Sequence, residues 1–318
     1  MISSHSVASP KNEKMMDNRG PDGWLVIDKP LGLTSNRVVQ VVRRHTGGKV
    51  GHAGTLDPLA TGVLPIALGE ATKTTSYAMN GRKRYRFRIR WGIARATDDR
   101  EGEVTGECPI RPSREAIEAI LPRFTGTILQ RPPAYSAIKI DGRRAYKLAR
   151  TDKPPLPSPR PADIAELRLI AMTDHDHSDC EAVVGKGTYI RALARDLGTA
   201  LGTLAHIAGL RRLSVGSFTE SQAMSLDSLA EHGHIAPNCG FLLPIGTGLD
   251  DIPALVLTRG EAARLRCGQS VIPSEAGASD GLGGLKEGAI VAVWHDQALI
   301  ALARIEHCRI RPVRVINR

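Results

Sequence analysis

The segment RYRFRIRW, residues 84–91, constrains the fold of this chain more than any other feature of the sequence. Apolar and cationic side chains alternate along it, with Tyr85, Phe87, Ile89 and Trp91 interleaved with Arg84, Arg86, Arg88 and Arg90. Because successive strand residues point to opposite faces, this period of two predicts a β-strand with one apolar and one cationic face. The chain must therefore contain a sheet. The arginines either contact backbone phosphates or pair with neighbouring carboxylates, and the pattern leaves both open.

Strands and helices are both predicted on either side of this segment. WLVIDKP, residues 24–30, is typical of a short strand. A helix follows over residues 37–45, with Thr34 or Ser35 as its N-cap and Gly47 after its last turn. These signals indicate a mixed α and β protein.

Two later segments repeat this mixture of helix and strand. Ser113 is expected to cap a short helix over residues 114–121, and residues 181–202 predict a strand, a glycine turn and a helix beginning near Thr188. The turn contains GKGT, but Cys180 stands where a Walker A motif requires glycine, so a phosphate-binding P-loop is excluded. No GxGxxG fingerprint follows a strand, and no nucleotide cofactor is indicated.

The chain divides into three parts. Residues 1–20 are polar without an apolar core, so we expect a flexible tail and not a secretory signal. The composition shifts near residue 250, which predicts a large domain over 21–249 and a small one over 250–318. The small domain combines a helix opened by a Thr258–Glu261 capping box with two apolar strands joined by a short polar turn.

A long connecting segment lies inside the large domain. Residues 130–161 are rich in proline, arginine and lysine, and a connection of this length is usually functional. Its basic residues, Lys139 among them, alternate with tyrosines. That mixture suits a loop that clamps nucleic acid.

The net charge of +10 is concentrated in clusters such as GRKRYRFRIR and the last 15 residues. Such clusters indicate a polyanionic partner, and nucleic acid fits better than a membrane because no basic amphipathic helix with an aromatic face is present. A basic surface kept for solubility is the alternative. No apolar run is long enough to span a membrane, and five scattered cysteines fit a reducing cytoplasm.

Residues 174–180 raise the question of a metal site. His175, His177 and Cys180 lie close together in HDHSDC, but zinc ligands usually recur at tighter, repeated spacings. Solvated turns are the favoured interpretation, and we expect no metal.

The segment GHAGTLDPLATGVLP, residues 51–65, places one carboxylate, Asp57, in a small and apolar run. A buried carboxylate without a partner is costly or becomes protonated. Asp57 is therefore either a turn residue whose side chain bonds its own backbone, or a carboxylate that is kept charged because it has a function.

Together with this segment, several blocks resemble the TruB-type tRNA pseudouridine synthases. The blocks are DKPLGLTSN, KRYRFRIRWG, RPPAYSAIKIDGRRAYKLAR, KGTYIRALARDLG and LRRLSVGSF, in the order of the family, and the last 70 residues resemble its PUA domain. The segment RATDD, residues 95–99, departs from the family pattern. We expect this departure to affect local loop contacts and not the chemistry.

The resemblance and the basic loop together assign roles to eight residues. It implies that Asp57 is the catalytic aspartate, which detaches uracil from C1′ of the ribose so that it rejoins through C5, and that Arg191 is its ion-pair partner. It implies that Tyr85 stacks on the flipped base and assists proton transfer. Further substrate-binding residues implied by the family or by the basic loop are His52, Tyr189, Leu210, Lys29 and Lys139; for Lys29 a structural role is the alternative.

The resemblance implies an α+β enzyme with a mixed, largely antiparallel sheet, a central cleft and a small C-terminal β-rich PUA domain. We expect a cytoplasmic, monomeric enzyme that needs no cofactor and no protein partner and acts on uridine 55 in the T-arm of tRNA. Two alternatives remain. One is an RNA-guided relative acting on ribosomal RNA, and the other is a non-catalytic RNA-binding protein, which leaves Asp57 and Arg191 unexplained.

Overall fold

The computed structural model describes residues 20–136, 138–140, 143–144, 157–236, 239–274 and 284–317, with only the backbone at 139–140 and 143–144. The expected N-terminal tail, apart from Gly20, and much of the 130–161 loop lie outside these residues. Among the described residues, no helix is long and apolar enough to cross a membrane.

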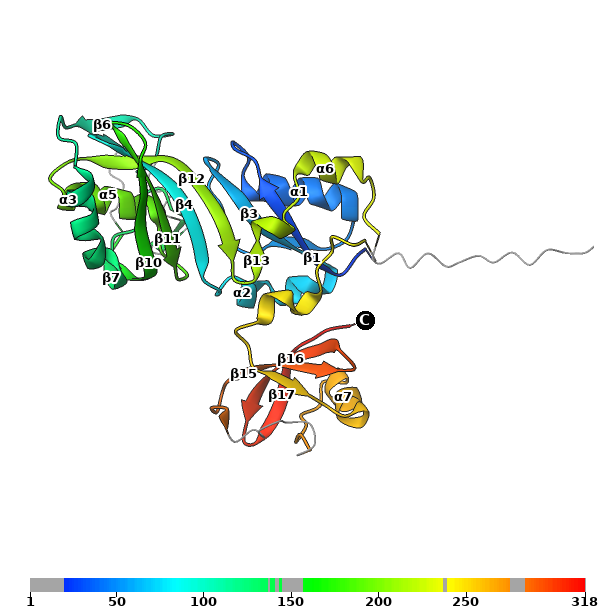
Figure 1. Ribbon diagram of the computed structural model, residues 1–318. Helices are drawn as coiled ribbons and strands as arrows, with labels where there is room; N and C mark the ends of the chain where they lie inside the picture. The colour runs from blue at the N-terminus through cyan, green and yellow to red at the C-terminus, as the bar shows by residue number, and fades with distance from the viewer. Residues whose placement is uncertain are drawn as a thin grey trace, which may run out of the picture.

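One nine-stranded sheet forms the frame of the large domain (Figure 1). Its main path runs β1-β3-β12-β4-β11-β10-β7, with β2 paired to β3 and β13 to β12. Every pair is antiparallel except β3 and β12, so the prediction of a mixed, largely antiparallel sheet is confirmed. The strands are β1 (Gly23–Lys29), β2 (Val50–His52), β3 (Ala60–Leu68), β4 (Lys83–Trp91), β7 (Gly126–Gln130), β10 (Arg160–Met172), β11 (His177–Val184), β12 (Ala205–Val215) and β13 (Phe218–Thr219).

Helices cover the two halves of this sheet. The helix after β1 is confirmed as α1 (Ser35–Thr46): the Thr34 side chain accepts a hydrogen bond from the Arg37 N–H, and Gly47 follows with a positive φ. The predicted N-cap Ser113 opens the third helix. The other helices are α2 (Thr75–Ala78), α3 (Arg114–Ile120), α5 (Ile190–Ala200) and α6 (Leu226–Glu231), with short 3₁₀ turns η1 (Gly69–Lys73), η2 (Leu121–Phe124), η3 (Glu220–Gln222) and η4 (Ile245–Leu249).

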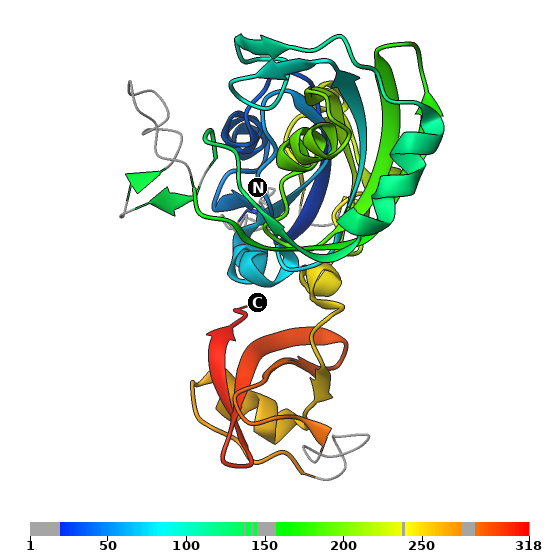
Figure 2. The ribbon, with the colours of Figure 1, turned by 90° about the vertical axis from the view of Figure 1, so that its left-hand side faces the viewer.

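Two apolar cores meet near the middle of the sheet. In one, α5 packs against the apolar face of β4, where Phe87, Ile89 and Trp91 are fully buried (Figure 2). In the other, α1 and α6 pack against β1 and β3. The side chains of Tyr85 and Leu210 border both cores. These two pocket candidates from the sequence therefore lie where the two cores meet.

The cationic face of β4 is paired with carboxylates. Arg84, Arg86, Arg88 and Arg90 form ion pairs with Glu166, Glu181, Asp179 and Asp176 respectively. Glu181 and Asp179 lie on the adjacent strand β11, Glu166 on β10 beyond it, and Asp176 in the turn between these two strands. Opposite charges on adjacent strands stabilise a sheet. Of the two alternatives for this arginine face, the structure favours carboxylate pairing.

Glycine is required where the two halves of the sheet join. Gly62 of β3 is paired in register with Arg212 of β12, and a Cβ on Gly62 would lie 2.2 Å from the Arg212 carbonyl oxygen. Gly62 also has a φ of +98°, which side chains other than glycine rarely adopt. The parallel pairing of β3 with β12 therefore depends on glycine at position 62. A separate two-stranded ribbon, β5 (Ile93–Arg95) and β6 (Val104–Glu107), extends from the end of β4.

The small domain contains a four-stranded sheet and α7 (Arg259–Arg266), whose Thr258–Glu261 capping box is confirmed. The two predicted strands are β15 (Ile290–His295) and β16 (Ala298–Glu306); β14 (Ala254–Val256) and β17 (Arg309–Val315) were not predicted. Asp296 and Gln297 have positive φ values, as a tight two-residue hairpin turn requires. Figures 1 and 2 show this domain as a separate body beyond η4.

The two domains share an apolar contact. Leu302 and Ile316 of the small domain belong to the same buried cluster as Trp24 and Phe218 of the large one. Polar contacts border it: the Lys73 ammonium donates to the Val315 carbonyl at 2.8 Å. The small domain thus joins the apolar cluster that η4 forms with β1, since Ile245 and Leu249 of η4 belong to the same cluster.

Candidate active site

A cavity of about 780 Å³ opens at the seam between the two cores. Segments far apart in the sequence line it: the loop after β2, the start of β4, residues 97–101, residues 185–191 and the middle of β12. Six of the eight candidate residues from the sequence line this cavity, namely His52, Asp57, Tyr85, Tyr189, Arg191 and Leu210. The cleft that the family resemblance implied is therefore present and holds most of the candidates.

Asp57 lies on a loop whose backbone is held on several sides. The buried Ser35 hydroxyl donates to the Leu56 carbonyl at 3.0 Å and accepts from the Leu56 N–H at 2.8 Å. The Lys29 ammonium donates to the Pro58 carbonyl at 3.3 Å. Because the residues on both sides of Asp57 are anchored, its carboxylate projects from a rigid support instead of a mobile loop.

Arg191 is the ion-pair partner of Asp57. Its Nη2 lies 3.0 Å from Oδ2 of Asp57, and the Arg191 side chain is 6% exposed while that of Asp57 is 40% exposed. Arg191 comes from the first turn of α5 and also donates to the carbonyls of Thr97 and Tyr135, at 2.8 and 2.9 Å. These bonds hold the guanidinium still, so it fixes one oxygen of Asp57 and leaves the carboxylate open to the cavity.

Two further carboxylates belong to the site and were missed from the sequence. Asp99 is buried, with one oxygen 3.6 Å from Nη1 of Arg191 and the other accepting from the Thr97 hydroxyl at 2.6 Å. Glu101 also lines the cavity, and burial, followed by the charges of Asp99 and Asp57, raises the pKa of its carboxyl. Asp99 is the last residue of the RATDD segment that departs from the family pattern, and Glu101 follows it by two positions. The expectation that this departure affects only local loop contacts remains untested, but the segment reaches the ion pair.

Aromatic and apolar side chains form part of the cavity wall. Tyr85, Leu210 and Tyr189 line it, from β4, β12 and the residue before α5. Burial raises the pKa of the Tyr189 phenol. Such a wall offers flat apolar surface on which a nucleobase can stack.

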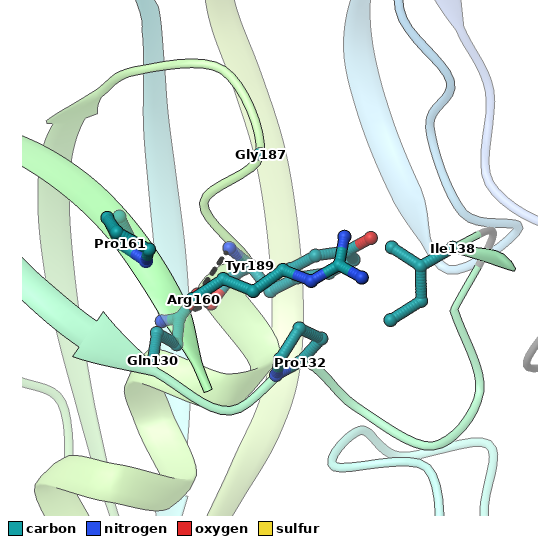
Figure 3. A pocket seen from close by; sticks show the side chains of 8 residues that line it. Gln130, Pro132, Ile138, Arg160, Pro161, Gly187 and Tyr189 are labelled. Carbon is teal, nitrogen blue, oxygen red and sulfur yellow. Dashed lines mark hydrogen bonds between the residues drawn. The ribbon is translucent and has the colours of Figure 1, made fainter. Parts of the chain in front are cut away.

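The backbone of Tyr189 is fixed by Gln130 of β7. The Gln130 amide accepts from the Tyr189 N–H at 2.8 Å and donates to its carbonyl at 3.1 Å. A second cavity of about 120 Å³ lies on the side of Tyr189 that faces Gln130, with Arg160 and Pro161 in its lining. Figure 3 shows the Arg160 side chain extending beside the Tyr189 ring. Tyr189 thus separates the large cavity from a smaller one.

His52 and Arg212 also line the cavity. The buried Arg212 guanidinium donates to the carbonyls of Gly54 and Val63, at 3.0 and 2.8 Å, and so ties the Asp57 loop to β3. Burial, followed by the Arg212 charge, lowers the pKa of His52. His52 is therefore a neutral imidazole at neutral pH. Arg212 carried no signal in the sequence beyond lying in the LRRLSVGSF block.

Lys29 and Lys139 differ from the other candidates. Lys29 is fully buried, is not among the cavity-lining residues, and donates to the carbonyls of Pro30, Leu33 and Pro58. This geometry favours its structural alternative. Lys139 lies in the two-residue strand β8 (Lys139–Ile140), paired with β9 (Arg143–Arg144), but its side chain is outside the described part of the chain.

The HDHSDC segment forms no metal-binding cluster within the described residues, where no three His, Cys, Asp or Glu side chains are placed to hold an ion. The His177 imidazole contacts Asp174 at 2.9 Å. Cys180 packs into the apolar core, and burial raises the pKa of its thiol to about 12. A deeply buried neutral thiol is a poor zinc ligand.

Comparison with protein families gives two matches in series. The model for the N-terminal domain of TruB family pseudouridylate synthases matches residues 41–190. The model for the C-terminal domain of tRNA pseudouridylate synthase B matches residues 191–244. Together they span the residues that line the cavity from His52 to Arg212.

Curated relatives are similar over nearly their whole length. The tRNA pseudouridine synthase B of Rhodospirillum rubrum is 51% identical, with 93% of this chain and 96% of that protein covered. The proteins of the same name from Bradyrhizobium diazoefficiens and Caulobacter vibrioides are 50% and 47% identical, with 96% and 93% of this chain and 89% and 96% of those proteins covered.

Solved structures share the fold at lower identity. The archaeal box H/ACA sRNP Nop10-Cbf5 complex matches with a TM-score of 0.71 and 23% identity, covering 93% of this chain and 86% of that one. An H/ACA RNP bound to a substrate RNA containing 2′-deoxyuridine matches with a TM-score of 0.71 and 22% identity, covering 97% and 93%. At these identities the likeness extends to the fold alone.

Proposed function

The chain belongs to the TruB family of pseudouridylate synthases, and on this premise we propose that it isomerises a uridine of tRNA with Asp57 as the catalytic carboxylate. The observation that carries the proposal is the ion pair between Asp57 and the buried Arg191 inside the cavity. It supplies what the reaction requires, which is one carboxylate held charged and aimed at the substrate.

The reaction rearranges the nucleoside without adding or removing atoms. The bond between N1 of uracil and C1′ of ribose breaks, the base turns, a bond forms between C5 and C1′, and the proton of C5 moves to N1. In our proposal Asp57 acts on the sugar, either by attacking it or by removing a proton from it. Arg191 holds Oδ2, so the other oxygen of Asp57 is the reacting atom.

The cavity suits a nucleotide that has left its stack. Its volume of about 780 Å³ lies within the usual range for small-molecule sites, roughly 300–1,000 Å³. An enzyme that acts on a base inside a folded RNA must first extrude that base. We propose that Tyr85, Tyr189 and Leu210 take up the uracil, and that the Tyr85 phenol serves the proton transfer at C5. Neutral His52 either helps to displace the base or fills the space that the base leaves in the RNA.

We further propose that the substrate is the T-arm of tRNA, with uridine 55 as the target and no guide RNA or partner protein required. The names of the similar curated proteins support tRNA as the substrate class. The RNA-guided alternative is kept because two solved structures that share the fold are named as H/ACA complexes. At 22–23% identity their likeness supports the fold alone, so the tRNA enzyme remains the proposal. A map of pseudouridine in cellular RNA, with and without this protein, distinguishes the two.

The test of the catalytic assignment is Asp57→Asn. Shape is retained and the reactive charge is lost, so we expect no turnover on a transcribed tRNA while binding stays within a few-fold. Asp179→Asn is the matched control, because Asp179 pairs with Arg88 on the outer face and does not line the cavity. Pseudouridine formed by Asp57→Asn above background would remove Asp57 from its role.

A further inference from the structure

Three cations gather at one end of the large cavity. Lys83 opens β4, Lys186 lies in the turn after β11, and Arg212 lies in β12, and all three line the cavity. Lys83 is 7% exposed and Arg212 is 1% exposed, whereas Lys186 is exposed. The acidic residues of the cavity, Asp57, Asp99 and Glu101, are gathered around Arg191 instead.

The contacts of these cations leave their charges uncompensated. The Lys83 ammonium donates to the Met79 carbonyl at 2.5 Å, the Lys186 ammonium donates to the amide oxygen of Asn80 at 2.9 Å, and Arg212 donates to carbonyls. Within the described part of the chain, none of the three forms an ion pair with a carboxylate. The same strand shows the contrast, since each arginine on the outer face of β4 is paired with an aspartate or glutamate.

A buried cation without an anionic partner costs free energy, part of which is recovered when an anion binds beside it. Burial lowers the pKa of Lys83 to about 8, and the nearby charges of Arg212 and Lys186 add to this effect. No carboxylate among the described residues offsets this repulsion. This end of the cavity is therefore suited to bind an anionic group of the substrate.

We propose that Lys83 and Lys186, with Arg212 behind them, bind one phosphodiester group of the RNA backbone adjoining the flipped uridine. The inference rests on the proposed function and deepens it. The target nucleotide enters with its sugar toward Asp57 and its base toward Tyr85, and its phosphate lies at the cationic end. The enzyme then holds the nucleotide at two points, which sets the position of C1′ relative to the carboxylate.

The test is a double-mutant cycle between protein and RNA. The RNA is a T-arm stem-loop in which one linkage, either 5′ or 3′ of the target uridine, is replaced by a neutral methylphosphonate. The proteins are wild type, Lys83→Met and Lys186→Met, with Lys49→Met as the matched control because Lys49 is exposed and outside the cavity. Dissociation constants and single-turnover rates are measured for each combination.

We expect Lys83→Met to weaken binding of the unmodified RNA about tenfold, as for a lost charged hydrogen bond. One of the two methylphosphonates should weaken binding to wild type similarly and have no further effect on Lys83→Met. The slope of log affinity against log salt should fall by about 0.7–0.9 in that variant. Lys83→Arg should restore binding, and Lys49→Met should behave as wild type.

The proposal is overturned if the effects of Lys83→Met and of the methylphosphonate on binding are additive at both linkages. An unchanged salt slope in Lys83→Met would also overturn it, since either result leaves Lys83 with a structural role only. Melting temperatures of the variants identify a folding defect, and Lys186→Met keeps the test valid in that case because Lys186 is exposed. Failure of the proposed function gives a different result. In that case wild type forms no pseudouridine in the unmodified stem-loop, whatever the cycle shows.

Discussion

At the scale of single residues, Arg191 organises the site. It lies within hydrogen-bond distance of two backbone carbonyls and of Asp57, and 3.6 Å from Asp99. The planar guanidinium serves several acceptors at fixed directions, which the single ammonium of lysine does not. The role of Arg191 therefore depends on the planar shape of its guanidinium as much as on its charge.

We therefore expect Arg191→Lys to keep the fold and to lower the single-turnover rate by about a hundredfold or more, because lysine retains the charge but cannot hold Oδ2 of Asp57 in the same fixed geometry. Arg195→Lys, one turn further along α5, is the control because Arg195 pairs with Asp98 outside the cavity. Rates within a few-fold of each other for the two variants would contradict the assigned role of Arg191.

The titration of Lys29 gives a second prediction at this scale. Burial lowers the pKa of Lys29 to about 8, against an ordinary value of 10.5. Between these two pH values the unfolded chain binds more protons than the folded one, so the contribution of Lys29 to stability rises with pH. The difference in free energy of unfolding between wild type and Lys29→Met should therefore grow from pH 8 to pH 10. Urea denaturation measures it, and a difference that stays constant with pH would refute the buried environment.

At the scale of elements, the helix α1 positions the Asp57 loop. Ser35 is at the start of α1, and its hydroxyl makes both hydrogen bonds to the backbone of Leu56. The loop therefore takes its position from a helix that the sequence predicted. The Gly54 carbonyl is fixed in turn by Arg212, from a strand far along the chain.

Ser35→Ala should lower the free energy of unfolding by about 1–3 kcal/mol, because the Leu56 polar groups lose their partner. Turnover should also fall, since Asp57 is no longer held at a fixed distance from the substrate. Ser113→Ala removes an N-cap at α3, outside the cavity, and should cost about 1 kcal/mol without changing turnover. Full activity of Ser35→Ala would show that the Asp57 loop does not need this support.

At the scale of the whole molecule, the small domain has two possible contributions. Its exposed arginines on β17 and near it suit RNA backbone contacts, as the resemblance to a PUA domain implies. Its apolar cluster with Trp24 and Phe218 also supports the large domain. A ring atom of Trp294 would lie 2.3 Å from a Cβ on Gly246, so the two domains approach closely.

Deleting residues 250–318 should reduce tRNA affinity more than the single-turnover rate at saturating RNA. The deletion removes the terminal positive charge and none of the residues that line the cavity. The exposed apolar cluster should also lower the melting temperature, so both measurements belong together. A truncated protein that stays folded but loses its single-turnover rate would contradict the assignment of this domain to RNA binding.

The sequence by itself determined the local secondary structure and the candidate catalytic groups. The period of two in β4, the N-caps Thr34 and Ser113 and the Thr258–Glu261 capping box depend on residues a few positions apart, and all are present as predicted. The family resemblance carried by the motif blocks also implied the mixed sheet and named the six candidate residues that line the cavity.

Only the tertiary structure decided which charges meet. Asp99, Glu101 and Arg212 enter the site from a loop and a strand that no local pattern connects with Asp57. The arginines of β4 face carboxylates across the sheet, and Lys29 bonds to backbone carbonyls instead of lining the cavity. The physical reason is that periodicity and capping are settled within one or two turns of chain. Ion pairs and cavity walls depend on strand order and register, which bring together residues more than a hundred positions apart.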